Sequence, residues 1–518
     1  MLSMLLAPHH AAAIPGPMPG NMVVPESFKL VRSSGKSNLY EAVLPANATY
    51  SLGPVLLADL RGDRFEVGRA YAALLGNETL DVYNRFISHH IPDPKTQNLF
   101  ADFADWLWTK FQAPHVPADF IKELDGMRSA SPVGNGNVTV DLVSRRFNTL
   151  GNLPADSQNL INSLLFELEK GMPPAEAALI NAVINALDKC TWCKKHFGRP
   201  GDLPLSPGCD AFGVWGSRTA GGRLFSSRNL DWEKDSGIGR HKLVNVMHVD
   251  GVAPYAMIGF ASGFGAIAGM SAAGLTVSEM NLDNALTTFD GPPFPIRLKM
   301  ILEQTDTLAK AKALWQATNN TDSMNYLVAS GPERSAFAIE AVRGFSRFFG
   351  DNAPAEASAT CAVGSEAGGT CGNGFPDLPA SGGKKAIGMP LTDAVWRTNH
   401  AVHADIMPTQ EPLFNGTTFR YELLRDLFTH YAEQNKPIGD AEAVAIAATL
   451  GIKGRDFLSC DPVQFADGDN IMSIAYAPKD ASDAAGHAWV AWEDGTGDSW
   501  RPAACAPYVR IDFARWWA

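Results

Sequence analysis

The sequence has little charge and no basic cluster, and these shortages exclude classes of partner. Only 19% of the 518 residues are charged, the net charge is −12, and the Lys and Arg residues form no dense patch. The sequence pI is near 5.5. Nucleic acid and anionic membrane surfaces repel an acidic chain of this kind, so neither is an expected partner.

Signatures of a metal, a nucleotide and a serine nucleophile are absent as well. The CxxC of Cys190–Cys193 has no second ligand pair at zinc spacing, and His400 and His403 have no third ligand at a recognised spacing. The run GFGAIAG from Gly263 misses the dinucleotide-binding spacing by one residue. GMSAAG around Ser271 is not a G-x-S-x-G elbow. We therefore expect no metal and no cofactor.

Long hydrophobic runs are scarce too. Residues 256–277 are uncharged and long enough to span a bilayer, but this stretch holds five glycines and two serines. That composition predicts buried strands joined by tight turns, and no stable membrane span. Residues 1–25 begin with a short apolar run without a basic region, which fits either a truncated secretory signal or a disordered tail.

Cysteine is rare, and its count is odd. Seven cysteines occur, which leaves one thiol free in an oxidising compartment. Local pairing is easy for Cys361 with Cys371 and for Cys190 with Cys193. Cys460 would then pair with Cys505, and Cys209 remains. Together with five Asn-x-Ser/Thr sequons, this predicts a secreted or lysosomal glycoprotein; the sequons lie at Asn47, Asn77, Asn137, Asn319 and Asn415.

The pattern of predicted secondary structure changes at Cys209. Apolar residues at helical spacing recur in residues 26–208, which predicts a mainly helical segment that ends in a Gly- and Pro-rich linker at 197–208. Residues 209–518 open with short strand-like runs, interrupted by helices at 295–317, 419–433 and 440–449. Residues 351–388 read as a loop insertion. The order of elements predicts a layered α+β body.

A hairpin around the turn TAGGR would collect reactive groups at one strand end. Centred on Ala220–Gly221, it places Cys209 opposite Trp232, with Arg228 and Asp231 within side-chain reach even if the register slips by one or two residues. A nearby guanidinium favours the thiolate, which is the nucleophilic form of cysteine. The alternative for an isolated Cys209 is a small buried core residue.

Cleavage before Cys209 would supply the base that this group lacks. No histidine lies close in sequence to this strand end. A free α-amino group on Cys209 would titrate at about 7.7–8.0 and could activate its own thiol. Gly208 in an exposed linker gives the backbone the freedom that self-cleavage requires. This predicts cleavage of the Gly208–Cys209 bond.

At this point the chain resembles the N-terminal-nucleophile (Ntn) hydrolases of the acyl-CoA:6-aminopenicillanic acid acyltransferase type, peptidase family C45. Wider relatives are the choloylglycine hydrolases, acid ceramidase and N-acylethanolamine acid amidase. The resemblance lies in stretches ordered between Gly208 and about Arg425, namely GCDAFGVWGSRTAGGRLFSSRNLDW, AGMSAAGLTVSEMNLDN, NYLVASGPERSAFAIEA, WRTNHAV and TTFRYELLRDL. In residues 26–208 it is carried only by GDRFEVGRAYAALLG, where a propeptide is expected.

The resemblance implies a four-layer αββα sandwich and attack by Cys209 on a linear amide. It implies that Arg228 and Asp231 hold the nucleophile and substrate, that Asn281 and Asn399 are oxyanion donors, and that Arg420 is the late active-site arginine. Each asparagine alone would otherwise be interpreted as a turn or loop cap. The substrate would be a small or lipid-like N-acyl amide, and the two fragments would stay associated after cleavage.

Three functions remain open from the sequence. The first is a self-processing cysteine amidohydrolase that forms a thioester acyl-enzyme. The second uses the same intermediate as an acyltransferase to an amine, or acts as a phospholipase B-like ester hydrolase. The third is a non-enzymatic secreted binding protein on the same fold, against which the complete residue set argues.

Overall fold

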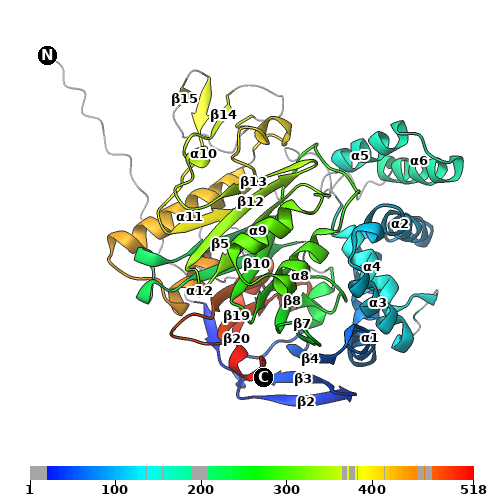
Figure 1. The fold of residues 1–518 in the computed structure, drawn as a ribbon, viewed down its shortest axis with the longest axis horizontal. Coiled ribbons are helices and arrows are strands. Elements are labelled where there is room, and N and C mark those ends of the chain that lie inside the picture. The colour runs from blue at the N-terminus through cyan, green and yellow to red at the C-terminus, as the bar shows by residue number, and fades with distance from the viewer. Residues whose placement is uncertain are drawn as a thin grey trace.

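The structure is a computed structural model of the chain, drawn in Figure 1. It describes residues 20–132, 134, 137–153, 157–189, 208–232, 234, 236–363, 370–372, 380–381, 383–413, 415–451, 460 and 470–518. Helices and strands are mixed along the chain, which confirms the predicted α+β class. The predicted linker and the Cys190–Cys193 pair lie outside the described residues.

One sheet has seven strands and carries the residue of greatest interest, Cys209. Its strand order is β1-β20-β19-β18-β6-β5-β17. The strands are β1 (Asn21–Val23), β20 (Pro507–Asp512), β19 (Gly486–Trp492), β18 (Asn470–Pro478), β6 (Phe225–Asp231), β5 (Cys209–Val214) and β17 (Ala394–Arg397).

The second sheet has ten strands in the order β13-β12-β11-β10-β9-β8-β7-β4-β3-β2. β11 and β12 form an antiparallel hairpin, and the uncharged stretch 256–277 forms three strands, β8 to β10, as predicted. The bounds are β13 (Phe345–Phe349), β12 (Ser335–Val342), β11 (Met324–Ser330), β10 (Leu275–Asn281), β9 (Ala268–Ser271), β8 (Tyr255–Phe260), β7 (Lys242–Val249), β4 (Leu56–Gly62), β3 (Ser37–Val43) and β2 (Ser27–Ser34).

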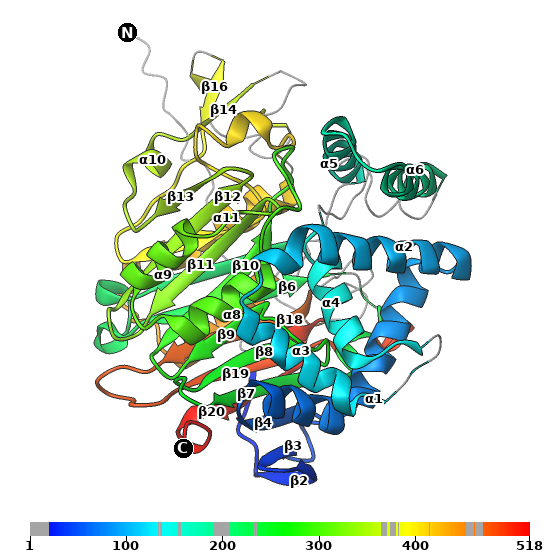
Figure 2. The ribbon, with the colours of Figure 1, turned by 45° about the vertical axis from the view of Figure 1, so that its right-hand side comes forward.

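Helices cover the sheets. Those predicted at 295–317, 419–433 and 440–449 are present as α8 and α9, α11, and α12. Figures 1 and 2 show α1 to α4 along one side of the sheets, with α5 and α6 above them. The bounds are α1 (Arg64–His90), α2 (Pro94–Leu107), α3 (Ala118–Ala130), α4 (Val140–Leu150), α5 (Ser157–Glu169), α6 (Pro174–Lys189), α8 (Phe294–Gln304), α9 (Leu308–Gln316), α10 (Pro354–Ala357), α11 (Asn415–Glu433) and α12 (Asp440–Gly451).

The two large sheets pack face to face through apolar side chains. Ile258 of β8 and Val244 of β7 share one core cluster with Ile474 of β18 and Val490 of β19. A second cluster joins the seven-stranded sheet to α11 and α12, and a third joins the ten-stranded sheet to α1, α3, α8 and α9. Because residues on both faces of a strand such as β5 are covered, its run CDAFGV is buried throughout.

The N-terminal segment is more than helical, which corrects the sequence-based description of residues 26–208. It contributes β2, β3 and β4 to the ten-stranded sheet, and β1 lies just before it. β4 runs parallel to β7, from Leu56 opposite Leu243 to Gly62 opposite Val249. The strand pattern of β2 is hard to read from the sequence because most of its residues are exposed or half-exposed.

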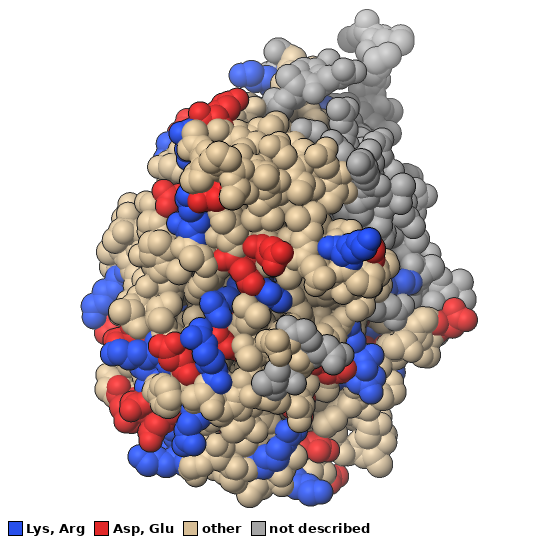
Figure 3. All heavy atoms as spheres, turned by 90° about the vertical axis from the view of Figure 1, so that its right-hand side faces the viewer, with Lys and Arg blue, Asp and Glu red and all other residues tan. Residues whose placement is uncertain are grey.

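The predicted loop insertion at 351–388 contains regular structure. Besides α10 it holds β14 (Thr360–Ala362), β15 (Ala380–Ser381) and β16 (Lys384–Ala386), which form a three-stranded sheet. Disulfides Cys361–Cys371 and Cys460–Cys505 are present as predicted. Across the described residues, helices that combine the length and apolarity of a membrane span do not occur. On the face shown in Figure 3, Lys and Arg lie interspersed with Asp and Glu.

Candidate active site

Cys209 begins a strand in the interior of the seven-stranded sheet. β6 and β17 flank β5 on its two sides. The Cys209 side chain is 5% exposed and its thiol is free. The thiol predicted to remain unpaired is therefore at the start of the strand next to the edge strand β17, between two packed layers.

The hairpin that carries Cys209 has a different register from the predicted one. Cys209 pairs with Leu230 and not with Trp232, a difference of two residues. The connection is longer than a tight turn because it contains two short 3₁₀ segments, Gly216–Arg218 and Ala220–Gly222. The difference lies within the slip that hairpin turns allow, and the same groups still meet at the strand end.

Arg228 lies on the same face of the sheet as Cys209. It is two residues from the partner of Cys209, and side chains alternate along a strand. The positive charge of its guanidinium favours the thiolate form of Cys209. The same guanidinium donates to Glu279 on β10 of the facing sheet, at 3.0 Å. A buried thiol, cation and carboxylate therefore form one row between the sheets.

These neighbours act on the thiol in opposite directions. Burial raises the pKa of Cys209, the Arg228 cation opposes this rise, and the carboxylates of Glu279 and Asp231 add to it. Burial also raises the pKa of Glu279, again against the pull of Arg228. Protonation of Glu279 would therefore favour the thiolate.

A second arginine binds groups on the opposite face of the strand end. Arg420 in α11 donates through Nη1 to the backbone carbonyl of Cys209 at 2.6 Å and to Oδ2 of Asp210 at 3.3 Å. The same nitrogen lies 3.7 Å from Oδ2 of Asp231. Burial raises the pKa of Asp210 although Arg420 opposes the rise, and the nearby Asp231 adds to it. Asn470 at the start of β18 donates to Asp231 at 2.8 Å.

Asn399 holds the backbone nitrogen of Cys209. β17 pairs with β5 up to Arg397 opposite Ala211, so Asn399 follows directly on the side of Cys209. Its Oδ1 accepts hydrogen bonds from the Cys209 nitrogen at 2.6 Å and from Arg420 Nη2 at 2.9 Å. Its Nδ2 donates to the backbone carbonyl of Asn281 at 2.9 Å.

Asn281 is placed differently from the other predicted residues. It ends β10, and its side-chain Nδ2 donates to Asp283 at 2.8 Å. It meets Asn399 through its backbone carbonyl. The structure thus gathers five of the six predicted side chains directly around the strand end, and these are Cys209, Arg228, Asp231, Asn399 and Arg420.

Two carboxylates of this group were not predicted as site residues. Asp210 follows Cys209 directly and binds Arg420. Glu279 lies two residues before Asn281 in SEMN, so strand alternation would have placed the two on one face, and this was the available signal. Neither residue has a spacing motif of its own.

Gly208 is buried where it enters β5, which corrects the prediction that this residue lies in an exposed linker. The candidate scissile bond therefore lies inside the site, next to the groups that hold the nitrogen and carbonyl of Cys209.

A small polar cavity adjoins the site. Its volume is about 10 Å³, room for roughly one water molecule. Asn399 forms part of its wall, together with Asp283, His400, Gln410, Glu411, Pro412, Leu413 and Thr417.

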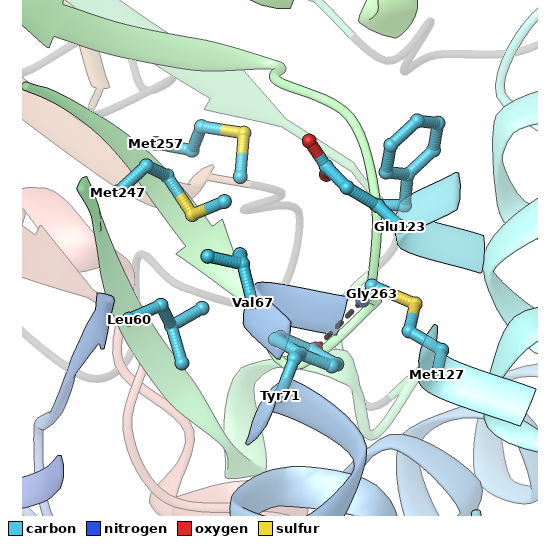
Figure 4. Close-up of a pocket in the computed structure, with 9 residues that line it drawn as sticks. Leu60, Val67, Tyr71, Glu123, Met127, Met247, Met257 and Gly263 are labelled. Carbon is cyan, nitrogen blue, oxygen red and sulfur yellow. Dashed lines mark hydrogen bonds between the residues drawn. The ribbon is translucent and has the colours of Figure 1, made fainter. Parts of the chain in front are cut away.

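A second cavity of similar size lies elsewhere, between α1, α3 and the ten-stranded sheet (Figure 4). Three methionines, with Leu60 and Val67, give it a mostly apolar wall, and the Tyr71 hydroxyl accepts from the nitrogen of Gly263 at 2.8 Å. Its residues belong to the helix–sheet core and not to the cluster that contains Cys209.

Comparisons with known proteins give similar solved structures only. No family model and no curated protein matches the chain. Similar structures include an N-acylethanolamine-hydrolyzing acid amidase ortholog of Caenorhabditis elegans, at 12% identity over 52% of this chain and 92% of that one, with a TM-score of 0.34. A mutant of conjugated bile acid hydrolase from Clostridium perfringens has 9% identity over 59% of this chain and 93% of that one, and a TM-score of 0.34.

Penicillin V acylase from Agrobacterium tumefaciens is also similar, at 10% identity over 55% of this chain and 83% of that one, with a TM-score of 0.27.

Proposed function

We propose that the protein is a self-processing cysteine Ntn hydrolase that cleaves a linear N-acyl amide through a thioester acyl-enzyme. The packing of helices against both outer faces of the two sheets supports the four-layer αββα arrangement that this class uses. The proposal rests on the groups around Cys209 and not on the fold, because a fold alone does not define an activity.

The main support for the proposal is the pair of hydrogen bonds that hold the backbone of Cys209. Asn399 accepts from its nitrogen at 2.6 Å, and Arg420 donates to its carbonyl at 2.6 Å. A backbone nitrogen of an ordinary internal cysteine does no chemistry. A nitrogen that becomes the general base of the site must be held beside the thiol, and here a buried carboxamide holds it.

Self-cleavage follows from the position of Gly208. The Cys209 sulfur adds to the Gly208 carbonyl carbon, the carbon–nitrogen bond breaks, and the released Cys209 nitrogen takes up the proton of the thiol. Water then hydrolyses the thioester, which leaves a carboxylate on Gly208 and a free thiol and α-amine on Cys209. Arg228 stabilises the thiolate in the first step, because its positive charge opposes the rise in the Cys209 pKa.

The mature site would repeat this chemistry on a substrate. The α-amine of Cys209 removes the thiol proton, the thiolate attacks the amide carbonyl, and the same amine protonates the leaving nitrogen. Water completes the cycle by hydrolysing the thioester. Asn399 and Asn281 each have one Nδ2 hydrogen engaged, so each has a second for the oxyanion.

The fragments would remain associated after cleavage. β4 of the N-terminal fragment is an interior strand of the ten-stranded sheet, paired with β3 on one side and β7 on the other. Buried ion pairs reinforce this contact, since Arg64 and Glu123 of the N-terminal fragment bind Glu303 and Lys299 of α8. Loss of the fragment would expose β7 and leave these charges unpaired.

The polar cavity beside Asn399 has room for about one water molecule. Two carboxylates, Asp283 and Glu411, contribute to its wall, and only Pro412 and Leu413 are apolar. Disulfides Cys361–Cys371 and Cys460–Cys505 support the secreted or lysosomal location.

The activity is tested with fluorogenic N-acyl amides of increasing chain length. Purified protein is incubated with each amide, and the acyl-enzyme is trapped by rapid acid quench and mass spectrometry. We expect an acyl adduct on the Cys209-containing peptide and amine release, both lost in Cys209→Ala. Amine release without an adduct, or equal release by Cys209→Ala, would contradict the proposal.

Adding a primary amine to the same reaction separates hydrolysis from transfer. A hydrolase gives free acid as the main product, whereas an acyltransferase converts the acyl-enzyme to the new N-acyl amide. Both outcomes keep the thioester step, so this control does not affect the central claim.

A further inference from the structure

The short turn that carries Asn399 is held by one buried side chain of the facing sheet. Asn325 of β11 donates through Nδ2 to the backbone carbonyl of Thr398 at 2.8 Å and to that of His400 at 2.9 Å. These two carbonyls belong to the residues on either side of Asn399. One carboxamide thus brackets the residue that binds the Cys209 nitrogen.

Asn325 is suited to this task by its two donors. Its side chain is fully buried, and its Oδ1 is without a hydrogen-bond partner among the residues that the structure describes. A buried polar atom without a partner lowers stability, so Asn325 carries an energetic cost at this position. A side chain between two carbonyls must present two N–H groups, which asparagine does in one short side chain.

The other contacts of the turn show why its position matters. The backbone nitrogen of Asn399 donates to Thr417 Oγ1 at 2.9 Å, and Glu340 accepts from the nitrogens of Val402 and His403 at 3.0 Å each. The Thr417 bond holds Asn399 itself, and the Glu340 bonds fix the chain three and four residues further on. Asn325 holds the carbonyls on either side of Asn399, whose carboxamide extends to Cys209.

We propose that Asn325 is a positioning residue for Asn399 and thereby sets where the Cys209 nitrogen is held. This rests on the proposed function, in which that nitrogen is first the leaving group of self-cleavage and then the general base. A displacement of about 1 Å in such a group can cost about a hundredfold in rate.

A matched control exists in the same protein. Asn320 is also buried, and its Nδ2 also donates to two backbone carbonyls, those of Val342 and Phe345, at 2.7 Å each. Its remaining partners are Arg297 and Ser346, which are not site residues. Asn320→Asp therefore imposes the same chemical change without touching the turn at Asn399.

The experiment compares Asn325→Asp with Asn320→Asp in the full chain. Self-cleavage at Gly208–Cys209 is followed by intact mass, and thermal unfolding is recorded for each variant. We expect only Asn325→Asp to cleave about 10- to 100-fold more slowly than the wild type. Asn320→Asp should lose less thermal stability, because Arg297 already donates to Asn320 Oδ1 at 2.8 Å and can pair with the new carboxylate. In acyl-amide turnover, Asn325→Asp should lower kcat and leave KM unchanged, because Asn325 would not touch substrate.

A pH profile adds a readout that a purely structural role would not move. A buried aspartate facing two carbonyls has a raised pKa, and its protonated form recovers one donor. Cleavage by Asn325→Asp should therefore recover as pH falls, relative to wild type at the same pH. If Asn325→Asp does not fold, Asn325→Ser, which removes both N–H donors with less bulk, is measured in its place.

The outcomes separate the two claims. Wild-type cleavage rates in Asn325→Asp, with cleavage lost in Asn399→Ala, would overturn the role of Asn325 and leave the proposed function standing. Equal slowing by Asn325→Asp and Asn320→Asp would also overturn it, because the effect would then be global. Absence of cleavage in the wild type itself would contradict the proposed function, and the role of Asn325 with it.

Discussion

From the row formed by Cys209, Arg228 and Glu279 we predict two shifts of opposite sign in the pKa of Cys209. The Arg228 cation favours the thiolate, whereas the Glu279 carboxylate disfavours it. Arg228→Met should therefore raise the pKa of Cys209, and Glu279→Gln should lower it. Two substitutions in one ion pair should move one thiol in opposite directions.

The magnitudes follow from the contacts. An opposite charge within about 4–6 Å changes a pKa by about 1–3 units, so Arg228→Met should raise the Cys209 pKa by that amount. Glu279→Gln should have a smaller effect, because the charge of Glu279 influences the Cys209 pKa less than that of Arg228 does. Each unit corresponds to a tenfold change in the thiolate fraction below the pKa.

The assay is a pH titration of the ultraviolet absorbance of the thiolate. Each spectrum is corrected with the same variant carrying Cys209→Ala, so other thiols and tyrosines cancel. Arg297→Met serves as the matched control, because Arg297 is equally buried and contacts residues outside the site. Shifts of the same sign in Arg228→Met and Glu279→Gln, or a comparable shift in Arg297→Met, would refute the reasoning.

Three further predictions concern stability. Glu123→Leu leaves the fully buried Lys299 ammonium without its nearest carboxylate, so it should cost about 3–5 kcal/mol in urea unfolding, and Lys299→Met in the same background should restore part of this. Cys460→Ser with Cys505→Ser opens a loop with a sequence separation of 45 residues and should cost about 4 kcal/mol in the same assay; no change would mean that this disulfide constrains nothing. Burial, with two nearby arginines, lowers the pKa of His400 to about 3. The contribution of the neutral His400 to the free energy of unfolding is therefore complete above the ordinary pKa of about 6.5 and is lost as pH falls towards 3. His400→Gln should make the decline of the unfolding free energy in that window shallower by about 1.4 kcal/mol per pH unit, and an unchanged slope would contradict the assignment.

Local features of the site could be read from the sequence, and cross-sheet features could not. Cys209 and Arg228 belong to one hairpin, so a slip of two residues in its register did not separate them. The change from helical to strand-like patterns at Cys209 could also be read from the sequence, as could the odd number of cysteines that leaves this one unpaired. Asn399 and Arg420 came from the family resemblance, since nothing in their spacing leads to Cys209.

The parts that escaped the sequence depend on long-range pairing. β4 lies beside β7 although roughly two hundred residues separate them, and β2 has few buried residues to reveal its period. Glu279 and Asn325 reach the site from the facing sheet, where only the packing of two layers brings them close. Hydrophobic periodicity identifies strands but does not show which strands face each other.

The most direct test of the account is the intact mass and N-terminal sequence of the purified protein beside Cys209→Ala. We predict that the wild type splits into two chains, the second beginning at Cys209, while Cys209→Ala remains whole. A wild-type chain that stays intact through prolonged incubation at acidic and neutral pH would contradict it, because Cys209 would then never acquire the free amine on which the proposed chemistry depends.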